Sequence, residues 1–478
     1  MRIEAKWPDA DFIVGNPPFL GGKLLRRQLG DLEVDDLFRV YGAQVPPEAD
    51  LVSYWFEKAR SQIAEKKANK AGLVATNSIR NGANRKVLEK VMQDAAIFEA
   101  WSDEPWVVDG ASVRVSLVCF SSKESRNSVL LNNLPVSNIN SDLTGGLVDL
   151  TQAVPLTENS GVSYQGITKG GLFQISADVA RKWLKNPKNA NGRKNSDVLF
   201  PMFSGGDIVK GAPMDWVVNF TGLSEREASF FEKPFEHVLK EVKPFRENNK
   251  RQLYRDRWWT FAEPRPGMLD AISNLERYIA TPKVSKYRVF VLAHKKALPD
   301  NLVIAIARSD FTCFGVLSSR FHEAWALAKG ATLEDRPTYT PTATFQTFPF
   351  PEGLTPTIPA ERYAKDRRAK AVAKAAAELN RLRNNWLYPD DSVRFEQEVS
   401  LGYPDRAIPI DTEAAVEMQS RTLTNLYNDR PTWLIDAHRD LDAAVAGAYG
   451  WPEDISTEDA LAALLELNRE RAAAQGSA

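Results

Sequence analysis

The sequence predicts an α/β region, then a region of mixed strands and helices, and then a helical region. Residues 1–125 alternate between short apolar runs typical of buried strands and longer segments with apolar residues at helical spacing. Residues 126–352 mix short strands, loops and short helices, whereas residues 353–478 are mainly helical and include the Ala-rich stretch 361–387. We therefore expect three domains with boundaries near residues 125 and 352.

The first region contains the clearest elements. The apolar runs predict strands at 11–15, 71–76, 97–105 and 112–122. The segments with apolar residues at helical spacing predict helices at 50–67 and 84–95, which end in polar or basic residues. Because strands that alternate with helices usually form parallel pairs, we expect a mostly parallel sheet covered on both faces. The Pro-rich segment 344–359 predicts a linker between the second and third regions.

Composition excludes several classes of protein. The net charge is −1, so any affinity for a polyanion must come from local clusters of charge. The two cysteines, Cys119 and Cys313, form neither a disulfide framework nor a CxxC metal motif, which suits a reducing cytoplasm. The four histidines show no metal-ligand spacing, and we expect no metal. No apolar run approaches the ~18 residues of a membrane span, and the first residues lack the apolar core of a signal peptide.

The first predicted strand runs directly into Asn16-Pro17-Pro18-Phe19. In a parallel sheet, ligands bind beyond the carboxyl ends of the strands, where this tetrapeptide lies. The Asn16 carboxamide and the Pro17 carbonyl supply two acceptors that can hold a planar amino group, and Phe19 offers a flat face for a ring. The prolines fix the backbone of the loop. The alternative interpretation is a rigid turn, because Asn-Pro marks turns.

The segment D-F-I-V-G-N-P-P-F resembles the catalytic motif of amino-group DNA methyltransferases. Further segments extend the resemblance over nearly the whole chain, and together they are similar to the MmeI-like (type IIL) restriction-modification enzymes: NPPFLGGKLLRRQLG, ADLVSYWFEKA, TNSIRNGANRKVLE, LSSRFHEAWA, TFQTFPFP and the closing stretch 421–452. The resemblance implies a bacterial or archaeal protein. It also implies the C-terminal half of a class I (Rossmann-like) methyltransferase sheet over 1–125, a target-recognition domain over 126–352 and a helical C-terminal domain over 353–478.

The resemblance also implies an activity and a set of site residues. The methyl group would pass from S-adenosylmethionine to the exocyclic amine of an adenine flipped out of double-stranded DNA. Asn16 and Pro17 would bind the amine, Pro18 would stiffen the loop, and Phe19 would stack on the base. Phe120 is the candidate for a second stacking residue, with a place in the core as its alternative. Asn77 and Ser78 would border the site.

The same family binds S-adenosylmethionine through a Gly-rich loop and an acidic strand end that precede the N-P-P-F strand. Only fifteen residues precede Asn16 here, and the glycine pairs in 143–150, 168–175 and 203–211 are not followed by the expected strand and acid. We therefore expect this chain to be an incomplete or split form, which binds the cofactor and transfers a methyl group only with an N-terminal methyltransferase fragment. A nuclease pattern is also absent, so we expect no DNA cleavage.

A locally basic stretch between residues 240 and 300 predicts a DNA interface, because clustered cations neutralise phosphates. Its candidate DNA-binding residues are Arg246, Lys250, Arg251, Arg255, Arg257, Lys283, Lys286 and Arg288. Trp258 and Trp259 are equally compatible with core packing and with stacking on a base.

Two alternatives to an adenine methyltransferase stay open. One is a non-catalytic DNA-binding remnant that keeps the recognition domain. The other is a methyltransferase of protein glutamine or of RNA, which uses a similar N-P-P motif; the long basic and aromatic region after residue 160 argues against it.

Overall fold

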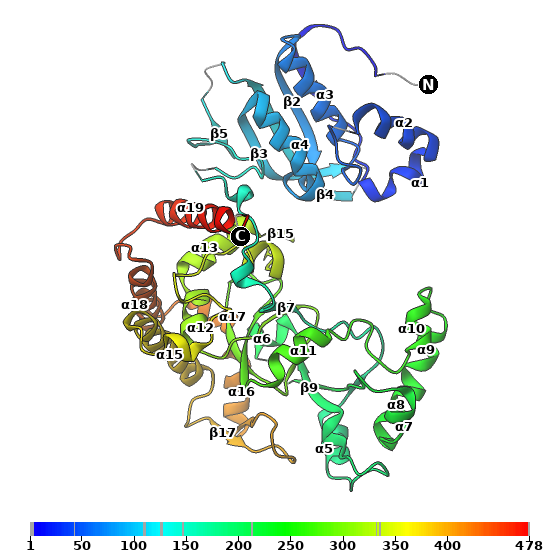
Figure 1. Ribbon diagram of the computed structural model, residues 1–478, viewed down its shortest axis with the longest axis vertical. Coiled ribbons are helices and arrows are strands. Elements are labelled where there is room, and N and C mark those ends of the chain that lie inside the picture. Colours follow the sequence, from blue (N-terminus) through cyan, green and yellow to red (C-terminus); the bar gives the residue numbers. More distant parts are fainter. Residues whose placement is uncertain are drawn as a thin grey trace. The chain divides into compact units, whose positions relative to one another are not determined.

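The computed structural model divides the chain into two compact units, Met1–Gln152 and Ala153–Ala478 (Figure 1). The described residues are 4–42, 44–108, 111–124, 128–145, 148–211, 214–330, 332–333 and 336–476. Each unit has its own core, and we describe each by itself.

A six-stranded sheet forms the centre of the first unit, with strand order β1-β2-β4-β3-β5-β6. Its strands are β1 (Ala10–Gly15), β2 (Ala68–Thr76), β3 (Ala95–Val108), β4 (Ala111–Ser122), β5 (Leu130–Leu131) and β6 (Leu134–Pro135). Only the β1–β2 and β3–β5 pairs are parallel. The expected mostly parallel sheet is therefore wrong: β3 and β4 follow each other through a connection too short for a crossover, so they pair antiparallel.

Four helices accompany this sheet: α1 (Leu25–Leu29), α2 (Asp31–Tyr41), α3 (Ser53–Ala64) and α4 (Gly82–Asp94). Helices α3 and α4 pack side by side against the sheet (Figure 1). Their apolar faces meet the alternating buried residues of β2 and β4, so Phe56, Val87, Leu73 and Val118 share one core. The helices predicted at 50–67 and 84–95 and the strand predicted at 71–76 correspond to α3, α4 and β2.

Strand β1 is the edge of the sheet, since it pairs only with β2 in the part of the chain that the structure describes. Its apolar side chains are unusually open: Phe12 is 66% exposed and Val14 is 84% exposed. Edge strands in stable proteins are normally short, charged or covered. This one presents unpaired backbone groups and apolar side chains together.

The second unit is built on two four-stranded sheets, with orders β13-β9-β10-β8 and β12-β11-β14-β7. Their strands are β7 (Ser163–Gln165), β8 (Gln174–Ile175), β9 (Leu199–Phe203), β10 (Asp215–Val218), β11 (Arg277–Pro282), β12 (Val291–His294), β13 (Leu298–Pro299) and β14 (Val303–Ile306). A shared core, which includes Phe173, Trp216 and Tyr278, joins the two sheets. Two short hairpins add β15 (Thr332–Leu333) with β16 (Arg336–Pro337), and β17 (Val393–Glu396) with β18 (Arg406–Pro409).

The helices of the second unit follow in chain order: α5 (Ala177–Leu184), α6 (Gly205–Lys210), α7 (Glu225–Ser229), α8 (Glu232–Glu241), α9 (Lys243–Glu247), α10 (Gln252–Asp256), α11 (Pro266–Ser273), α12 (Phe311–Ser318), α13 (Arg320–Lys329), α14 (Ala360–Tyr363), α15 (Arg367–Leu387), α16 (Thr412–Ser420), α17 (Leu423–Asp429), α18 (Thr432–Tyr449) and α19 (Thr457–Gly476). Helix α12 packs on α15 and α18, and α13 packs on α19. The domain boundary expected near residue 352 therefore lies inside a single compact unit, Ala153–Ala478.

The Pro-rich segment 344–359 is not a linker. Its aromatic residues Phe345, Phe348 and Phe350 are fully buried. The buried Asn159 donates hydrogen bonds to the carbonyls of Phe345 and Phe348, at 3.3 and 2.7 Å. Prolines leave fewer backbone donors to satisfy, so such a segment can lie in a core when neighbouring side chains bind its carbonyls. No helix among the described residues is both long enough and apolar enough to cross a membrane.

Helix α18 carries a carboxyl group whose ionisation opposes folding. Burial raises the pKa of Asp442 from 3.8 to about 6, although the backbone N–H of Arg320 donates to its Oδ1 at 2.9 Å. Because the folded carboxyl holds its proton more tightly than the unfolded one, folding stability falls as the pH rises through the window between these two pKa values.

We predict that Asp442→Asn stabilises the second unit more at about pH 7.5 than at about pH 4.5. The amide oxygen still accepts the hydrogen bond from the Arg320 N–H, and the substitution removes the buried charge. In guanidinium unfolding, the free-energy gap between variant and wild type should widen by on the order of 1–2 kcal/mol across this window. The control is Asp440→Asn, since the Asp440 side chain on the same helix is 72% exposed. A gap for Asp442→Asn that is independent of pH would contradict the assignment.

Candidate amine-binding site and nucleic-acid interface

The N-P-P-F loop (Asn16–Phe19) leaves the sheet where the parallel strands β1 and β2 end. Gly15 lies opposite Leu73 in the β1–β2 register. The 3-10 helix η2 (Asn77–Arg80) follows β2 at the same end of the sheet. The structure therefore places this loop and η2 at the carboxyl ends of neighbouring strands, where ligands of α/β proteins bind.

The side chains of the loop differ in accessibility in a way that suits a clamp. Pro17 is buried and fixes the loop on the unit, Phe19 is half-buried, and Asn16 is exposed. Among the described residues, no hydrogen bond involves the Asn16 carboxamide. Its oxygen and amino group are thus free to bind a ligand, whereas a structural asparagine at a turn normally bonds to the neighbouring backbone.

A hollow of about 470 Å³ runs along β1 up to the loop. It is lined by Trp7, Pro8, Ala10, Phe12, Ile13, Val14, Gly15, Asn16, Pro17, Pro18, Trp55 and Leu73. These walls offer flat apolar surface but no charged side chain. S-adenosylmethionine carries ribose hydroxyls, a carboxylate and a sulfonium, which require polar and acidic partners. The described residues of this hollow therefore do not fit the whole cofactor by themselves.

Asn77 and Ser78 lie on η2 and are held by neighbours. The Asn77 Nδ2 donates to Oδ1 of Asp103 at 2.7 Å, and the Ser78 hydroxyl donates to Oδ2 of Asp50 at 2.5 Å. Asn77 Oδ1 is buried without a partner among the described residues. Their role at the border of the site stays a prediction. Of the two, Asn77 has a buried oxygen, Oδ1, that accepts no hydrogen bond from another described residue.

Phe120 lies in the core of the first unit. It is fully buried, and its ring stacks on Phe56 with 6.2 Å between centroids. It pairs opposite Ala71, towards the amino end of β2 and away from the N-P-P-F loop. In this conformation neither face of the ring is open to a base, so the core alternative describes its position. Alternation along a strand indicates the face on which a residue lies. It does not indicate whether the residue lies near the N-P-P-F loop or at the opposite end of the sheet.

Close packing explains one glycine of each of the three pairs. A Cβ on Gly170 would lie 2.6 Å from the Cβ of Ala262, and one on Gly205 would lie 2.7 Å from the Leu302 carbonyl oxygen. A Cβ on Gly145 would lie 2.8 Å from Cγ1 of Val136. The glycines therefore permit contacts within the fold, and the described ones do not form a cofactor loop.

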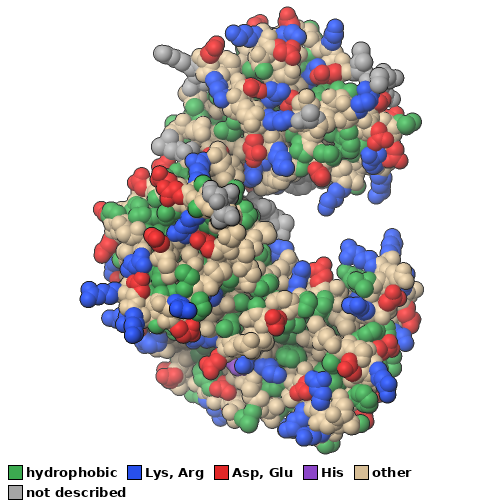
Figure 2. Space-filling model, in the orientation of Figure 1, with side chains coloured by type: hydrophobic (Ala, Val, Ile, Leu, Met, Phe, Trp, Pro, Cys, Tyr) green, Lys and Arg blue, Asp and Glu red, His purple; other side chains and the backbone are tan. Residues whose placement is uncertain are grey.

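The predicted cationic cluster is largely exposed on α9, α10 and the turn between them. Lys250, Arg251, Arg255 and Arg257 are exposed there, and none forms an ion pair with another described residue. Figure 2 shows Lys and Arg side chains gathered beside hydrophobic ones at the end of the arm that α9 and α10 form in Figure 1. The hydrophobic members include Phe245 and Leu253, each 59% exposed, which sequence analysis missed because apolar residues in short helices normally predict burial.

Two of the predicted DNA-binding residues are structural, which corrects the sequence prediction. Arg246 is fully buried, and its Nη2 donates to the carbonyls of Lys169 and Thr260 at 3.0 and 3.2 Å. Arg288 is 8% exposed and donates to Thr281 and to backbone carbonyls. Burial lowers the pKa of Arg288 to about 10, so it stays charged at neutral pH. Neither can reach a phosphate in this conformation.

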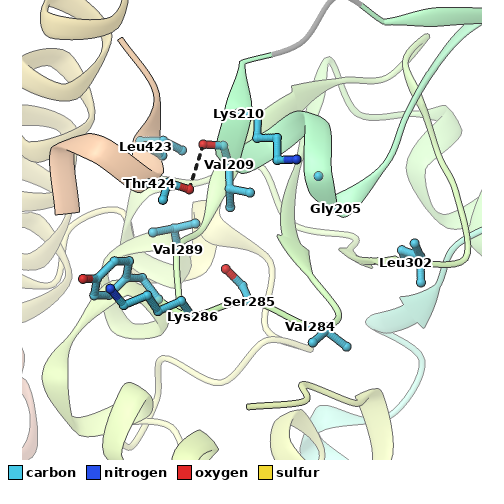
Figure 3. Close-up of a pocket in the computed structure, with 12 residues that line it drawn as sticks. Gly205, Val209, Lys210, Val284, Ser285, Lys286, Val289, Leu302, Leu423 and Thr424 are labelled. Atoms are coloured by element: carbon cyan, nitrogen blue, oxygen red, sulfur yellow. Dashed lines mark hydrogen bonds between the residues drawn. The ribbon is translucent and has the colours of Figure 1, made fainter. Parts of the chain in front are cut away.

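Lys283 is half-buried and Lys286 is exposed. Lys286 lines a cavity of about 390 Å³ between the loop after β11, helix α6 and helix α17 (Figure 3). Its Nζ donates to Asn428 at 2.9 Å, and the Thr424 hydroxyl across the cavity donates to the Val209 carbonyl at 3.2 Å. The cavity is mostly apolar, and the exposed cations among its described lining residues are Lys210 on α6 and Lys286.

The tryptophan pair belongs to the core. Trp258 is 5% exposed, and the indole N–H of Trp259 donates to the Leu223 carbonyl at 2.9 Å. Of the two equal alternatives, the structure favours core anchoring. Among the described residues, no group of three or more His, Cys, Asp or Glu side chains could hold a metal ion.

Comparisons with known proteins identify two domains in the chain. The family model described as the MmeI DNA-methyltransferase domain matches residues 2–132, and the model described as the MmeI target recognition domain matches residues 167–352. No curated protein matches the chain.

Among solved structures, the type IIL restriction-modification enzyme MmeI, solved in complex with DNA, superposes with a TM-score of 0.70 at 19% sequence identity. The match covers 97% of this chain and 57% of that one, so the chain spans little more than half the length of the enzyme it matches. The type IIG restriction endonuclease BpuSI matches over 97% of this chain and 54% of its own, at 10% identity and a TM-score of 0.28, which is too low to support a comparison.

Proposed function

Because the chain belongs to the MmeI-like family of DNA methyltransferases, we propose that it supplies the base-binding and DNA-binding parts of a site-specific adenine methyltransferase in a restriction-modification system. The observation that carries this proposal is the exposed carboxamide of Asn16, which forms no hydrogen bond with another described residue and lies on a proline-stiffened loop at the carboxyl ends of β1 and β2.

The chemistry of the loop suits an exocyclic amine. The Asn16 Oδ1 and the Pro17 carbonyl accept the two hydrogens of the amino group, which directs the nitrogen lone pair towards the methyl donor. Phe19 packs on the ring of the base and offsets part of the few kcal/mol that unstacking costs. The amine becomes positively charged as it gains the methyl group and then loses a proton to solvent, so the loop needs no dedicated base.

Double-stranded DNA is the proposed partner of the second unit. The exposed cations Lys250, Arg251, Arg255 and Arg257 neutralise phosphates and position the duplex. Phe245 and Leu253 lie among them, and apolar side chains in such surroundings contact base or sugar surfaces in DNA grooves.

The free edge of β1 is the proposed docking place of a further methyltransferase segment, on the same chain or on a separate one. Such a segment would pair with β1 in the sheet, cover Phe12 and Val14, and complete the hollow with the acidic and glycine residues that S-adenosylmethionine requires. The cofactor would then supply the methyl group, and Asn16 would hold the amine that receives it.

A DNA-binding remnant without catalysis is the second candidate. The observation that favours it is the lack of a charged side chain among the described residues that line the hollow.

We predict that Asn16→Ala abolishes methyl transfer in an enzyme reconstituted with the proposed methyltransferase segment. Loss of one acceptor frees the amine to rotate, and the rate should fall at least ~100-fold. DNA affinity, measured by fluorescence anisotropy, should change less than about twofold, because Asn16 contacts only the extruded base. The matched control is Asn69→Ala on β2, where the carboxamide donates to Asp11. A parallel loss of DNA binding would contradict the division of roles between the units.

We predict that this chain alone gives no binding heat with S-adenosylmethionine at cofactor concentrations up to roughly 100 μM in calorimetry. Adding a polypeptide with a strand–GxG–helix unit should restore the binding of S-adenosylmethionine. It should also slow the hydrogen exchange of the β1 amides. Clear micromolar binding by this chain alone would refute the incomplete-site proposal. Protection of β1 without cofactor binding or methyl transfer would favour the remnant.

We predict that the double variant Arg255→Gln/Arg257→Gln reduces the slope of log K against log salt by about 2, since each exposed arginine that contacts a phosphate contributes about 1. The control Arg226→Gln, an exposed arginine on α7 outside the cluster, should leave the slope unchanged. Arg246→Gln should instead lower the unfolding midpoint, because it removes the buried side-chain hydrogen bonds to the carbonyls of Lys169 and Thr260. An unchanged slope in the double variant would remove this cluster from the interface.

A further inference from the structure

The carboxylate of Asp50 connects three separate segments around the N-P-P-F loop. Its Oδ1 accepts a hydrogen bond from the backbone N–H of Gly22 at 2.9 Å. Its Oδ2 accepts one from the Ser78 hydroxyl at 2.5 Å and one from Nδ2 of Asn84 at 2.9 Å. Gly22 follows the loop, Ser78 follows β2, and Asn84 begins α4.

Asn84 completes this network from the other side. It is 7% exposed, and its Oδ1 accepts hydrogen bonds from the backbone N–H of Asp50 at 2.6 Å and from the Ser53 hydroxyl at 3.2 Å. The two residues are therefore joined in both directions. The Asn84 amino group donates to the Asp50 carboxylate, and the Asn84 oxygen accepts from the Asp50 backbone N–H. Buried networks of this kind stabilise one arrangement when every member is paired.

The backbone of the loop lies tightly against the segment that carries Asp50. A Cβ on Gly22 would lie 2.2 Å from the Glu48 carbonyl oxygen, so only glycine fits there. The Leu51 N–H also donates to the Leu20 carbonyl at 2.8 Å. The chain that follows the N-P-P-F loop is thus fixed at Leu20 and Gly22, whereas β1 before the loop pairs with β2 alone among the described residues.

We propose that Asp50 is a positioning residue that sets the orientation of Asn16 and Phe19 by fixing the chain after the loop to the end of β2. The inference rests on the proposed function for its catalytic consequence, but the positioning itself requires neither DNA nor cofactor. Asp50 acts through Gly22 and Ser78, so it lies outside the group that touches the substrate. Its two oxygens already accept three hydrogen bonds, which makes it unsuited to act as a general base.

The donor and acceptor pattern provides a sharp test through an exchange of the two residues. Asp50→Asn places an amino group against either the amino group of Asn84 or the backbone N–H of Gly22, and Asn84→Asp places two carboxylates in contact. The double variant Asp50→Asn/Asn84→Asp again pairs one amide with one carboxylate. Each single variant should disrupt the network, and the double variant should restore it in part, a coupling that independent sites would not show.

The readout is hydrogen exchange of the amides between Leu20 and Leu24 in the full chain without ligand. We expect at least a ~10-fold faster exchange in Asp50→Asn, recovery in the double variant, and unchanged exchange in β4. Glu48→Gln, an exposed carboxyl two residues earlier in the same segment, is the matched control. Once methyl transfer is reconstituted, kcat should follow the same pattern with a loss of ~10-fold or more, while the Kd for DNA stays constant.

Several outcomes would overturn the proposal. One is unchanged exchange at Leu20–Leu24 in both single variants. Another is equal acceleration across β4, which would show that Asp50 only supports global stability. If the single variants do not fold, a double variant that folds with wild-type exchange supports the network, and one that does not fold refutes it. Correct exchange behaviour without any effect on kcat would instead count against the proposed function of the loop.

Discussion

The parallel pairing of β1 with β2 is the constraint on which the candidate site depends. Its register, from Ala10 opposite Ala68 to Gly15 opposite Leu73, brings the ends of two strands to the same edge of the sheet. Yet β1 has one neighbour and open apolar side chains, so the pairing alone leaves the N-P-P-F loop weakly restrained. Contacts after the loop, at Leu20 and Gly22, supply the restraint that the strand lacks.

Burial sorts the cations of the second unit into two roles. Arg246 and Arg288 lie inside, where each donates hydrogen bonds to backbone carbonyls. Arg255 and Arg257 lie outside, where the charge is available to a polyanion. A net charge of −1 is compatible with DNA binding for this reason, because the local excess of exposed charge at α9 and α10 decides the electrostatics of that surface.

The sequence predicted what depends on local pattern and failed where distant segments decide. Strand β2, helix α4 and the position of the N-P-P-F loop follow from periodicity and turn chemistry, and the structure confirms an α/β first region. Segment 344–359 looked like a linker because its prolines are visible in the sequence, whereas the side chains that bind its carbonyls, such as Asn159, come from far along the chain. Arg246 was assigned to DNA binding, and Phe120 was left between stacking and core, for the same reason: residue type suggests a role, but only tertiary packing determines access.

The two compact units carry complementary parts of the proposed reaction. The free energy of DNA binding by one unit would have to offset the cost of extruding a base for the other. Holding an adenine on Asn16 and Phe19 requires its removal from the stack, which costs a few kcal/mol. In the proposed function, the exposed cations of α9 and α10 would supply binding energy that is independent of sequence, and contacts to base edges would add discrimination. In this division, DNA affinity resides mainly in the second unit, and the first unit uses it to hold one base in a fixed orientation.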